Sequence, residues 1–237
     1  MANAIYIWSK SPLNQYEFIK NCSIYNISHV FLSAYRFVDN RDYFSNIIIN
    51  NNLKFFAMAS TNEFLKRHNL ALKYIDDVIS FNKKVGDKQS FSGIHFDIEP
   101  YVLPEYKQFK KEILSDYISL LKKCYEKISS HGLEFGVSIP YWYKYKQRRI
   151  FVDVNGKNKC CLNSIVDNSD HISIMAYRAN VNQIVGSVKA EMNYSKKQVF
   201  VAVNNLLNLK RISDTLFKHY SFEGLAIHHY HKLISLD

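Results

Sequence analysis

Eight short apolar runs, spread evenly over the whole chain, constrain the fold more than any other feature. Each run is rich in β-branched or aromatic residues and is too short for a typical helix, so each is predicted to form a buried strand. With eight runs in 237 residues, one falls about every 30 residues, which is the size of a strand followed by a helix. The runs cover residues 4–8, 27–35, 53–60, 91–99, 134–142, 171–177, 198–205 and 222–230.

The segments between the runs show the spacing of amphipathic helices. Helices are predicted over 104–130 and 63–85, which end before Gly132 and Gly86, and a shorter one around Ile212. Strands that alternate with helices, without a break in composition, indicate an α/β fold with a parallel sheet covered by helices.

Eight such units in one domain favour a (β/α)₈, or TIM, barrel over 1–237, and the alternative is an open doubly wound sheet. Only seven residues follow the eighth run, so the last helix is expected to be short or missing. Four cysteines in a chain of this length do not make a disulfide scaffold, and the adjacent Cys160 and Cys161 are expected to be free thiols.

The fourth run carries the most reactive side chains of the sequence. Because side chains alternate between the two faces of a strand, His95, Asp97 and Glu99 share one face and the apolar residues between them share the other. Helices cover the outside of a barrel, which places the three polar side chains inside it. Glu99 lies at the carboxyl end of the strand, where barrel enzymes carry their catalytic groups.

Two neighbouring carboxylates indicate a pair with divided roles. An apolar wall and the charge of Asp97 are expected to raise the pKa of Glu99, so that it holds a proton near neutral pH, while Asp97 stays ionised beside His95. Two other interpretations remain open. In the first, His95, Asp97 and Glu99 form a buried ion-pair network that only stabilises the barrel. In the second, His95, Asp97, Glu99 and His228 bind the metal ion of a metal-dependent hydrolase.

The motif Ser92-x-x-His95-x-Asp97-x-Glu99 resembles the D-x-x-D-x-D-x-E motif of the chitinase and endo-β-N-acetylglucosaminidase family of glycoside hydrolases, family eighteen. Ser92 and His95 stand where that family has its first two aspartates. Similar elements follow in the same order over most of the chain. The resemblance implies a TIM barrel with glycosidase activity and no cofactor.

Two further strands carry the resemblance. Met175 and Tyr177 match the family's M-x-Y-D strand, and residues 136–140 resemble its small-residue strand that ends in proline. The resemblance implies that Glu99 is the general acid and that Asp97 orients a substrate acetamide, whose carbonyl is the nucleophile. Tyr177 would support the acetamide with its hydroxyl, and Met175 would line the floor of the pocket.

Departures from the family's pattern leave a second function open, a barrel that binds carbohydrate without cleaving it. Besides the two missing aspartates, Arg178 replaces the acid that follows the tyrosine, and the eighth run lacks the family's tryptophan. In that run His228 and Tyr230 are expected to point inward instead. The predicted substrate contacts are His95, Tyr101, Trp142, Met175, Arg178, His228 and Tyr230.

The basic character of the chain bears on its partners. The formal charge of +10 attracts polyanions, and the cations within 144–149 favour an anionic oligo- or polysaccharide over a neutral one. No recognised nucleic-acid module is present, so a specific nucleic-acid partner is not expected. An Asn155-Gly156 pair downstream predicts a hairpin turn.

Location and assembly are predicted from what the sequence lacks. It has no apolar run long enough to span a bilayer, and its N-terminus lacks the cationic and apolar regions of a signal peptide. We therefore expect a monomer without a membrane partner, either cytoplasmic or secreted after removal of a leader.

Overall fold

The computed structural model of the chain describes residues 2–8, 14–35, 40, 44, 47–48, 52–143, 150–192, 198–204 and 206–234. Eight parallel strands close into a barrel in the order β1-β10-β9-β8-β5-β4-β3-β2. They are β1 (Asn3–Ile7), β2 (Ile27–Ser33), β3 (Lys54–Ala59), β4 (Gly93–Phe96), β5 (Glu134–Pro140), β8 (His171–Met175), β9 (Gln198–Val203) and β10 (Gly224–Ile227). Each barrel strand coincides with one of the apolar runs, although β1 begins one residue before its run, so the predicted TIM barrel is confirmed and the open sheet is excluded.

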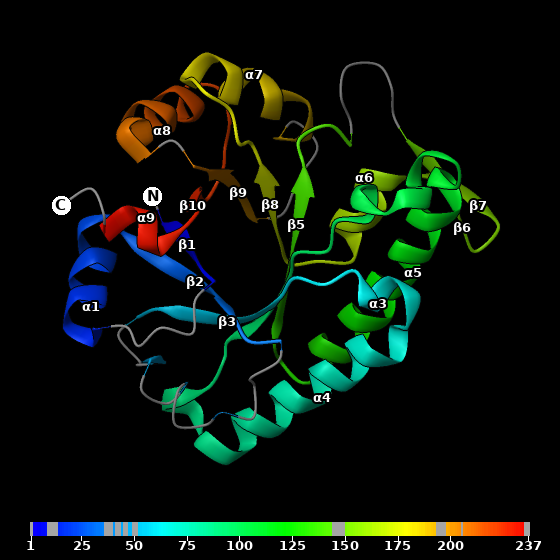
Figure 1. The fold of residues 1–237 in the computed structure, drawn as a ribbon, viewed down its shortest axis with the longest axis horizontal. Helices are drawn as coiled ribbons and strands as arrows, with labels where there is room; N and C mark the ends of the chain where they lie inside the picture. The colour runs from blue at the N-terminus through cyan, green and yellow to red at the C-terminus, as the bar shows by residue number, and fades with distance from the viewer. Residues whose placement is uncertain are drawn as a thin grey trace.

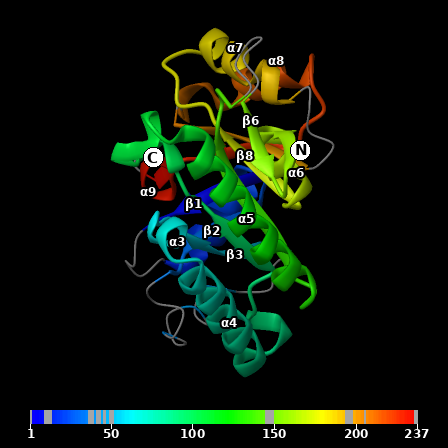
Figure 2. The ribbon, with the colours of Figure 1, turned by 90° about the vertical axis from the view of Figure 1, so that its right-hand side faces the viewer.

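Helices surround the barrel (Figure 1). They are α1 (Gln15–Ile24), α3 (Glu63–Lys66), α4 (His68–Val85), α5 (Lys110–Ser129), α6 (Cys161–Asp167), α7 (Val181–Met192), α8 (Leu209–Phe217) and α9 (Tyr230–Ile234). Short 3-10 helices are η1 (Asp87–Gln89), η2 (Pro100–Val102), η3 (Pro104–Lys107) and η4 (Leu206–Asn208). The long helices α4 and α5 pack together along one side of the barrel (Figure 2).

The helix boundaries refine the predictions. The segment 63–85 is divided between α3 and α4, and 104–130 between η3 and α5. The last helix, α9, has only five residues, as expected. None of the helices in the described part of the chain is both long and apolar enough to cross a membrane.

The hairpin predicted at Asn155-Gly156 is present, and it joins β6 (Phe151–Val154) to β7 (Lys157–Cys160). Both turn residues have positive φ angles, 54° and 74°, which Asn and Gly adopt most readily. The hairpin packs against α5. Cys160, at its end, and the other three cysteines are free thiols.

Alternation along the strands divides the core into two layers. On β4, Ile94 and Phe96 belong to the layer between strands and helices, whereas His95 points into the barrel and is fully buried. The face assignment made from the sequence is therefore correct. The apolar residues inside the barrel are Ala4, Tyr6, Phe31, Phe56, Met58, Met175, Phe200, Ala202 and Ala226.

Gly136 on β5 creates the space in which two histidines meet. Its register partners are His95 on β4 and His171 on β8. A Cβ atom on Gly136 would lie 1.8 Å from Nε2 of His171. The strand can therefore carry no side chain here while both imidazole rings keep their places.

Gly136→Ala is expected to lower the free energy of unfolding by about 3 kcal/mol, because the packed ring can move only at the cost of strain. Urea unfolding measures the change. Gly186→Ala in α7 is the matched control, since no atom lies within 4 Å of the added Cβ and alanine favours the helix by about 0.5–1 kcal/mol. A Gly136→Ala protein as stable as the wild type would contradict this packing.

Candidate active site

Asp97 and Glu99 lie where the chain leaves the barrel after β4. The backbone N–H of Asp97 donates to the carbonyl of Ala59 at 2.9 Å, so pairing with the β3 strand continues to this point. Asn62 then holds the backbone of Glu99 on both sides, accepting from its N–H at 3.0 Å and donating to its carbonyl at 3.2 Å. Both carboxyl groups are thereby fixed at the carboxyl end of the barrel.

The side chain of Glu99 is held by an aromatic pair. The hydroxyl of Tyr101 donates to Oε1 of Glu99 at 2.6 Å, which is short for an O–H···O hydrogen bond. The Tyr101 ring meets Trp142 edge-on, with centroids 5.0 Å apart. Burial, followed by the hydrogen bond to Glu99, raises the pKa of Tyr101. The structure thus brings together three residues that the sequence analysis placed at the site.

The carboxyl group of Asp97 has a raised pKa, which the sequence analysis did not predict. Burial and then the charge of Glu99 raise the pKa of Asp97 from its ordinary value to about 6, while the hydroxyls of Ser138 and Ser60 oppose the rise. Oδ2 accepts from Ser60 at 3.4 Å. Asp97 does not pair with His95 as expected, because the two ring nitrogens of His95 bond to other residues.

Asp97→Asn provides a test of this burial. A carboxyl pKa raised from about 3.9 to about 6 stabilises the fold below pH 4, and the contribution is lost as pH rises through 6. Between pH 4 and pH 7.5 the unfolding free energy of Asp97→Asn is expected to gain about 3 kcal/mol relative to the wild type. Urea unfolding at both pH values measures this, with the exposed Asp167→Asn as control. If the difference in unfolding free energy between Asp97→Asn and the wild type does not change with pH, Asp97 is solvated.

Beneath Asp97 lies a buried polar network that the sequence analysis did not identify. His95 Nδ1 lies 3.1 Å from His171 Nε2, and His95 Nε2 lies 3.0 Å from Ser138 Oγ. The Tyr6 hydroxyl lies 3.1 Å from Ser138 Oγ and donates to Ser173 at 2.8 Å. His95 has no exposed surface, so the prediction that it contacts substrate is wrong.

A second group of aromatic residues lies at the ends of other strands. The ring of Tyr177 lies 4.9 Å from that of His228, which accepts a hydrogen bond from Trp8 Nε1 at 3.1 Å. Burial, with smaller effects from Tyr6, Asp97 and Glu99, raises the pKa of Tyr177. Tyr177 is nevertheless 37% exposed, so part of its side chain is open to a ligand.

Met175, below Tyr177, is 7% exposed and lies in the inner cluster, where the resemblance places it. Arg178 is exposed and stacks on the ring of Tyr141, with 4.3 Å between the guanidinium carbon and the ring centroid. The cations within 144–149, which favoured an anionic glycan, lie outside the described residues.

The prediction that Tyr230 points into the barrel is wrong. The β10 strand ends at Ile227, and Tyr230 begins α9 on the outer side. Its side chain is 3% exposed, packs against the ring of Phe18 and accepts a hydrogen bond from Asn21 at 3.4 Å. Tyr230 therefore packs the last helix against α1 and does not lie at the site.

The metal-binding interpretation is not supported. Among the described residues, no three His, Cys, Asp or Glu side chains lie close enough together to hold a metal ion. His95, Asp97, Glu99 and His228 all belong to the described part, so they do not form a metal site in this arrangement.

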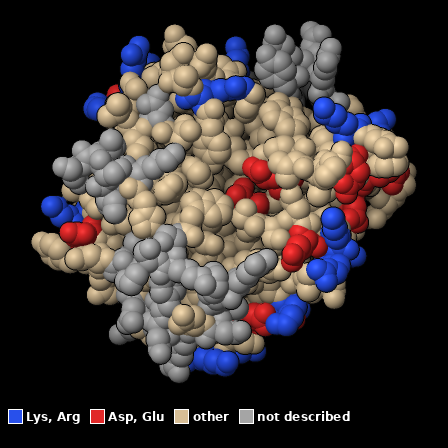
Figure 3. All heavy atoms as spheres, in the orientation of Figure 1, with Lys and Arg blue, Asp and Glu red and all other residues tan. Residues whose placement is uncertain are grey.

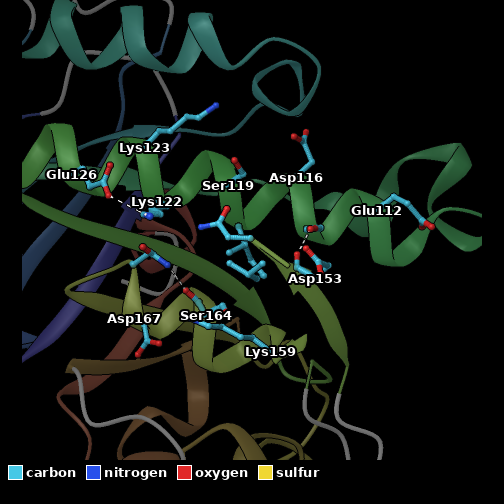
Figure 4. Close-up of a pocket in the computed structure, with 15 residues that line it drawn as sticks. Glu112, Asp116, Ser119, Lys122, Lys123, Glu126, Asp153, Lys159, Ser164 and Asp167 are labelled. Atoms are coloured by element: carbon cyan, nitrogen blue, oxygen red, sulfur yellow. Dashed lines mark hydrogen bonds and ion pairs between the residues drawn. The ribbon is translucent and has the colours of Figure 1, made fainter. Parts of the chain in front are cut away.

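The face seen in Figure 3 is hollowed near its middle, and acidic side chains lie beside the hollow. A separate groove of about 870 Å³ lies on the outer wall, between α5, the β6–β7 hairpin and α6 (Figure 4). Its walls mix carboxylates such as Asp116 and Asp153 with lysines such as Lys122 and Lys159. None of the residues predicted for the site lines this groove.

Comparison with known proteins identifies the fold. No family model and no curated protein matches the sequence. Among solved structures, a GH18 chitinase from Pseudoalteromonas aurantia has a TM-score of 0.62 at 11% identity, covering 97% of this chain and 94% of that one.

Two further matches cover a smaller share of the other protein's chain. A class V chitinase from Nicotiana tobaccum gives a TM-score of 0.55 at 16% identity over 84% of this chain and 65% of that one, and a mutant of it is solved in complex with NAG4. The spore cortex-lytic enzyme SleL of Bacillus megaterium QM B1551 gives 0.51 at 13% identity, over 85% and 49%. The chain thus spans about two thirds of the first of these proteins and about half of the second. It has the TIM-barrel fold of the GH18 chitinases and related proteins.

Proposed function

We propose that the chain is a glycoside hydrolase that cleaves an N-acetylated glycan, with Glu99 as general acid and Asp97 as the residue that orients the substrate acetamide. The observation that carries this proposal is the pair of carboxyl groups at the carboxyl end of the barrel, with the Tyr101 hydroxyl on one oxygen of Glu99. Barrel enzymes carry their catalytic groups at this end.

The hydrogen bonds around Glu99 suit a general acid. Of the described residues, only Tyr101 bonds to its carboxyl group, through Oε1. This leaves Oε2 as the oxygen that presents a proton to the glycosidic oxygen. The neighbouring charge of Glu99 helps to raise the pKa of Asp97 to about 6, so the two carboxyls together retain one proton in mildly acidic solution.

Asp97 and Tyr177 suit recognition of the acetamide. An ionised Asp97 accepts the acetamide N–H and so directs its carbonyl oxygen toward the anomeric carbon, in place of an enzyme nucleophile. The Tyr177 hydroxyl donates to the same carbonyl oxygen from the end of β8. The pKa of Tyr177, raised mainly by burial, also responds to the charges of Asp97 and Glu99, which supports its position beside them.

The experiment is a hydrolysis panel. Purified protein is incubated with chitooligosaccharides, with their de-N-acetylated counterparts, and with N-acetylated glycans that carry carboxylates, and products are identified by mass spectrometry. We expect cleavage only where an acetamide is present. Faster cleavage of the carboxylate-bearing glycans would support the anionic preference. Absence of cleavage from the whole panel would refute the proposed activity.

Carbohydrate binding without turnover is the second candidate, because Ser92 and His95 stand at the positions of two motif aspartates. Calorimetric titration with the same panel separates the two functions. Saturable binding of a glycan that is never cleaved favours the second candidate, and any wild-type turnover that exceeds that of a Glu99→Gln protein excludes it.

A further inference from the structure

A continuous chain of buried hydrogen bonds ends directly beneath Asp97. It runs from His171 to His95 at 3.1 Å and on to Ser138 at 3.0 Å. Ser138 Oγ lies 3.1 Å from the Tyr6 hydroxyl, which in turn donates to Ser173. None of these side chains is more than 2% exposed. The hydrogen bonds of these side chains therefore form within the protein and not with solvent.

The two histidines have only one consistent arrangement of protons. Burial lowers the pKa of His95 to about 3 and that of His171 well below its ordinary value, so both rings are neutral and each carries one N–H. His171 Nδ1 is buried and has no partner among the described residues. If it carried the proton, a donor would be left unpaired, which is rarer and costlier than an unpaired acceptor. His171 therefore donates from Nε2 to His95, and His95 donates from Nε2 to Ser138.

This direction leaves the hydrogen of the Ser138 hydroxyl with two acceptors. One is the oxygen of Tyr6, whose own hydrogen goes to Ser173. The other is Asp97, because the pairing of Phe96 with Val137 places Ser138 opposite Asp97 on the inner face. Oδ1 of Asp97 is buried and has no hydrogen bond within 3.5 Å to a described residue. An ionised carboxylate is the stronger acceptor of the two.

We propose that the His171–His95 pair makes Ser138 a hydrogen-bond donor to Asp97, so that Ser138 is a positioning residue for this carboxylate. When Asp97 is protonated, the hydroxyl turns to Tyr6 instead. The catalytic consequence rests on the proposed function, since it is the ionised Asp97 that accepts the acetamide. An acidic side chain at position 95 would accept from Ser138 and compete with Asp97, whereas a neutral imidazole that donates to Ser138 does not.

Other groups also act on Asp97 and must stay constant in a test. Glu99 is the charged neighbour, and Ser60 donates to Oδ2. The titratable groups that face Asp97 from other elements are Tyr6, Tyr101, Tyr117 and Tyr177. A substitution that removes only the Ser138 hydroxyl leaves all of them in place.

The test compares Ser138→Ala with Ser173→Ala, which removes a hydroxyl of equal size from the same network without touching Asp97. The Asp97 carboxyl is titrated by carbon-13 NMR, with the signal assigned from Asp97→Asn. Loss of the donor is expected to raise the pKa of Asp97 by about one unit in Ser138→Ala. In Ser173→Ala the freed Tyr6 hydroxyl turns to Ser138, so the pKa stays constant or falls.

No rise in Ser138→Ala, or an equal rise in both variants, would overturn the proposal. If Ser138→Ala does not fold, Ser138→Cys replaces the hydroxyl by a weak donor of similar size and is expected to raise the pKa of Asp97 in the same direction. The titration needs no catalytic activity. If the chain cleaves no glycan, the proposed function is refuted, but the role of Ser138 as a donor to Asp97 is still decided by the titration. Where cleavage occurs, the acidic limb of kcat/KM shifts with the Asp97 pKa in Ser138→Ala but not in Ser173→Ala.

Discussion

Glu99→Gln is expected to lower kcat/KM for glycan cleavage by about 10²–10⁴-fold, the usual contribution of a general acid. Glutamine has the same shape as glutamate, and its amide oxygen can still accept from Tyr101. The backbone contacts with Asn62 do not involve the carboxyl group. The loss should therefore fall on kcat, with glycan binding and unfolding free energy close to those of the wild type.

Glu63→Gln is the matched control. Its exposed carboxylate also accepts from a tyrosine hydroxyl, that of Tyr35 at 3.3 Å, but it belongs to α3 and not to the chain that leaves β4. Steady-state kinetics on a cleaved glycan and calorimetric binding are measured for both variants. Equal activity of Glu99→Gln and the wild type would show that Glu99 takes no part in the reaction. A loss of activity in Glu63→Gln as large as that in Glu99→Gln would show that the effect does not depend on the position of Glu99 after β4.

The sequence predicts the barrel well because strand periodicity and helix caps are local signals. Gly86, placed at the end of a helix by sequence, is indeed its cap, with a φ of 75°. The error at Tyr230 has a local cause as well. The alternation of faces was extended beyond Ile227, where β10 ends and the chain turns into α9, and alternation applies only within a strand.

The site is harder to predict because its energetics depend on pairs of residues far apart in sequence. The inward direction of His95 followed from alternation, but its partners Ser138 and His171 lie on β5 and β8. Their approach requires the register of three strands and the missing side chain at Gly136. The pattern Gly136-x-Ser138 beside His171-x-Ser173 was the available signal, since polar residues at inward positions of two adjacent strands are unusual in a packed barrel.

The same buried histidines are expected to make the fold unstable in acid. Burial lowers the pKa of His29 to about 4, that of His95 to about 3 and that of His171 well below its ordinary value. Unfolded histidine titrates near 6.5, so below that pH the unfolded chain binds three protons that the folded chain does not. Their stabilising effect is present above about pH 6.5 and is lost as pH falls.

Asp97 acts in the opposite direction over part of this range. Between about pH 4 and 6 the folded chain keeps the Asp97 proton that the unfolded chain has lost, so the net uptake on unfolding is two protons. Each proton contributes about 1.4 kcal/mol per pH unit. The unfolding free energy is therefore expected to fall by about 5 kcal/mol between pH 6.5 and 4.5, a large part of the stability of an ordinary domain.

His29→Phe isolates one of these protons. Its ring stacks on Phe56 at 5.6 Å, and its Nε2 has no partner among the described residues. Phenylalanine therefore preserves the ring packing and removes the titration, together with the 2.7 Å hydrogen bond between Nδ1 and Ser28 Oγ. Urea unfolding between pH 4.5 and 6.5 should show the pH slope reduced by about 1.4 kcal/mol per unit in this variant, and no change of slope in the exposed His219→Gln. A wild-type slope near zero would mean that the three rings are charged or hydrated in solution, and the proton assignment that directs Ser138 toward Asp97 would fail with it.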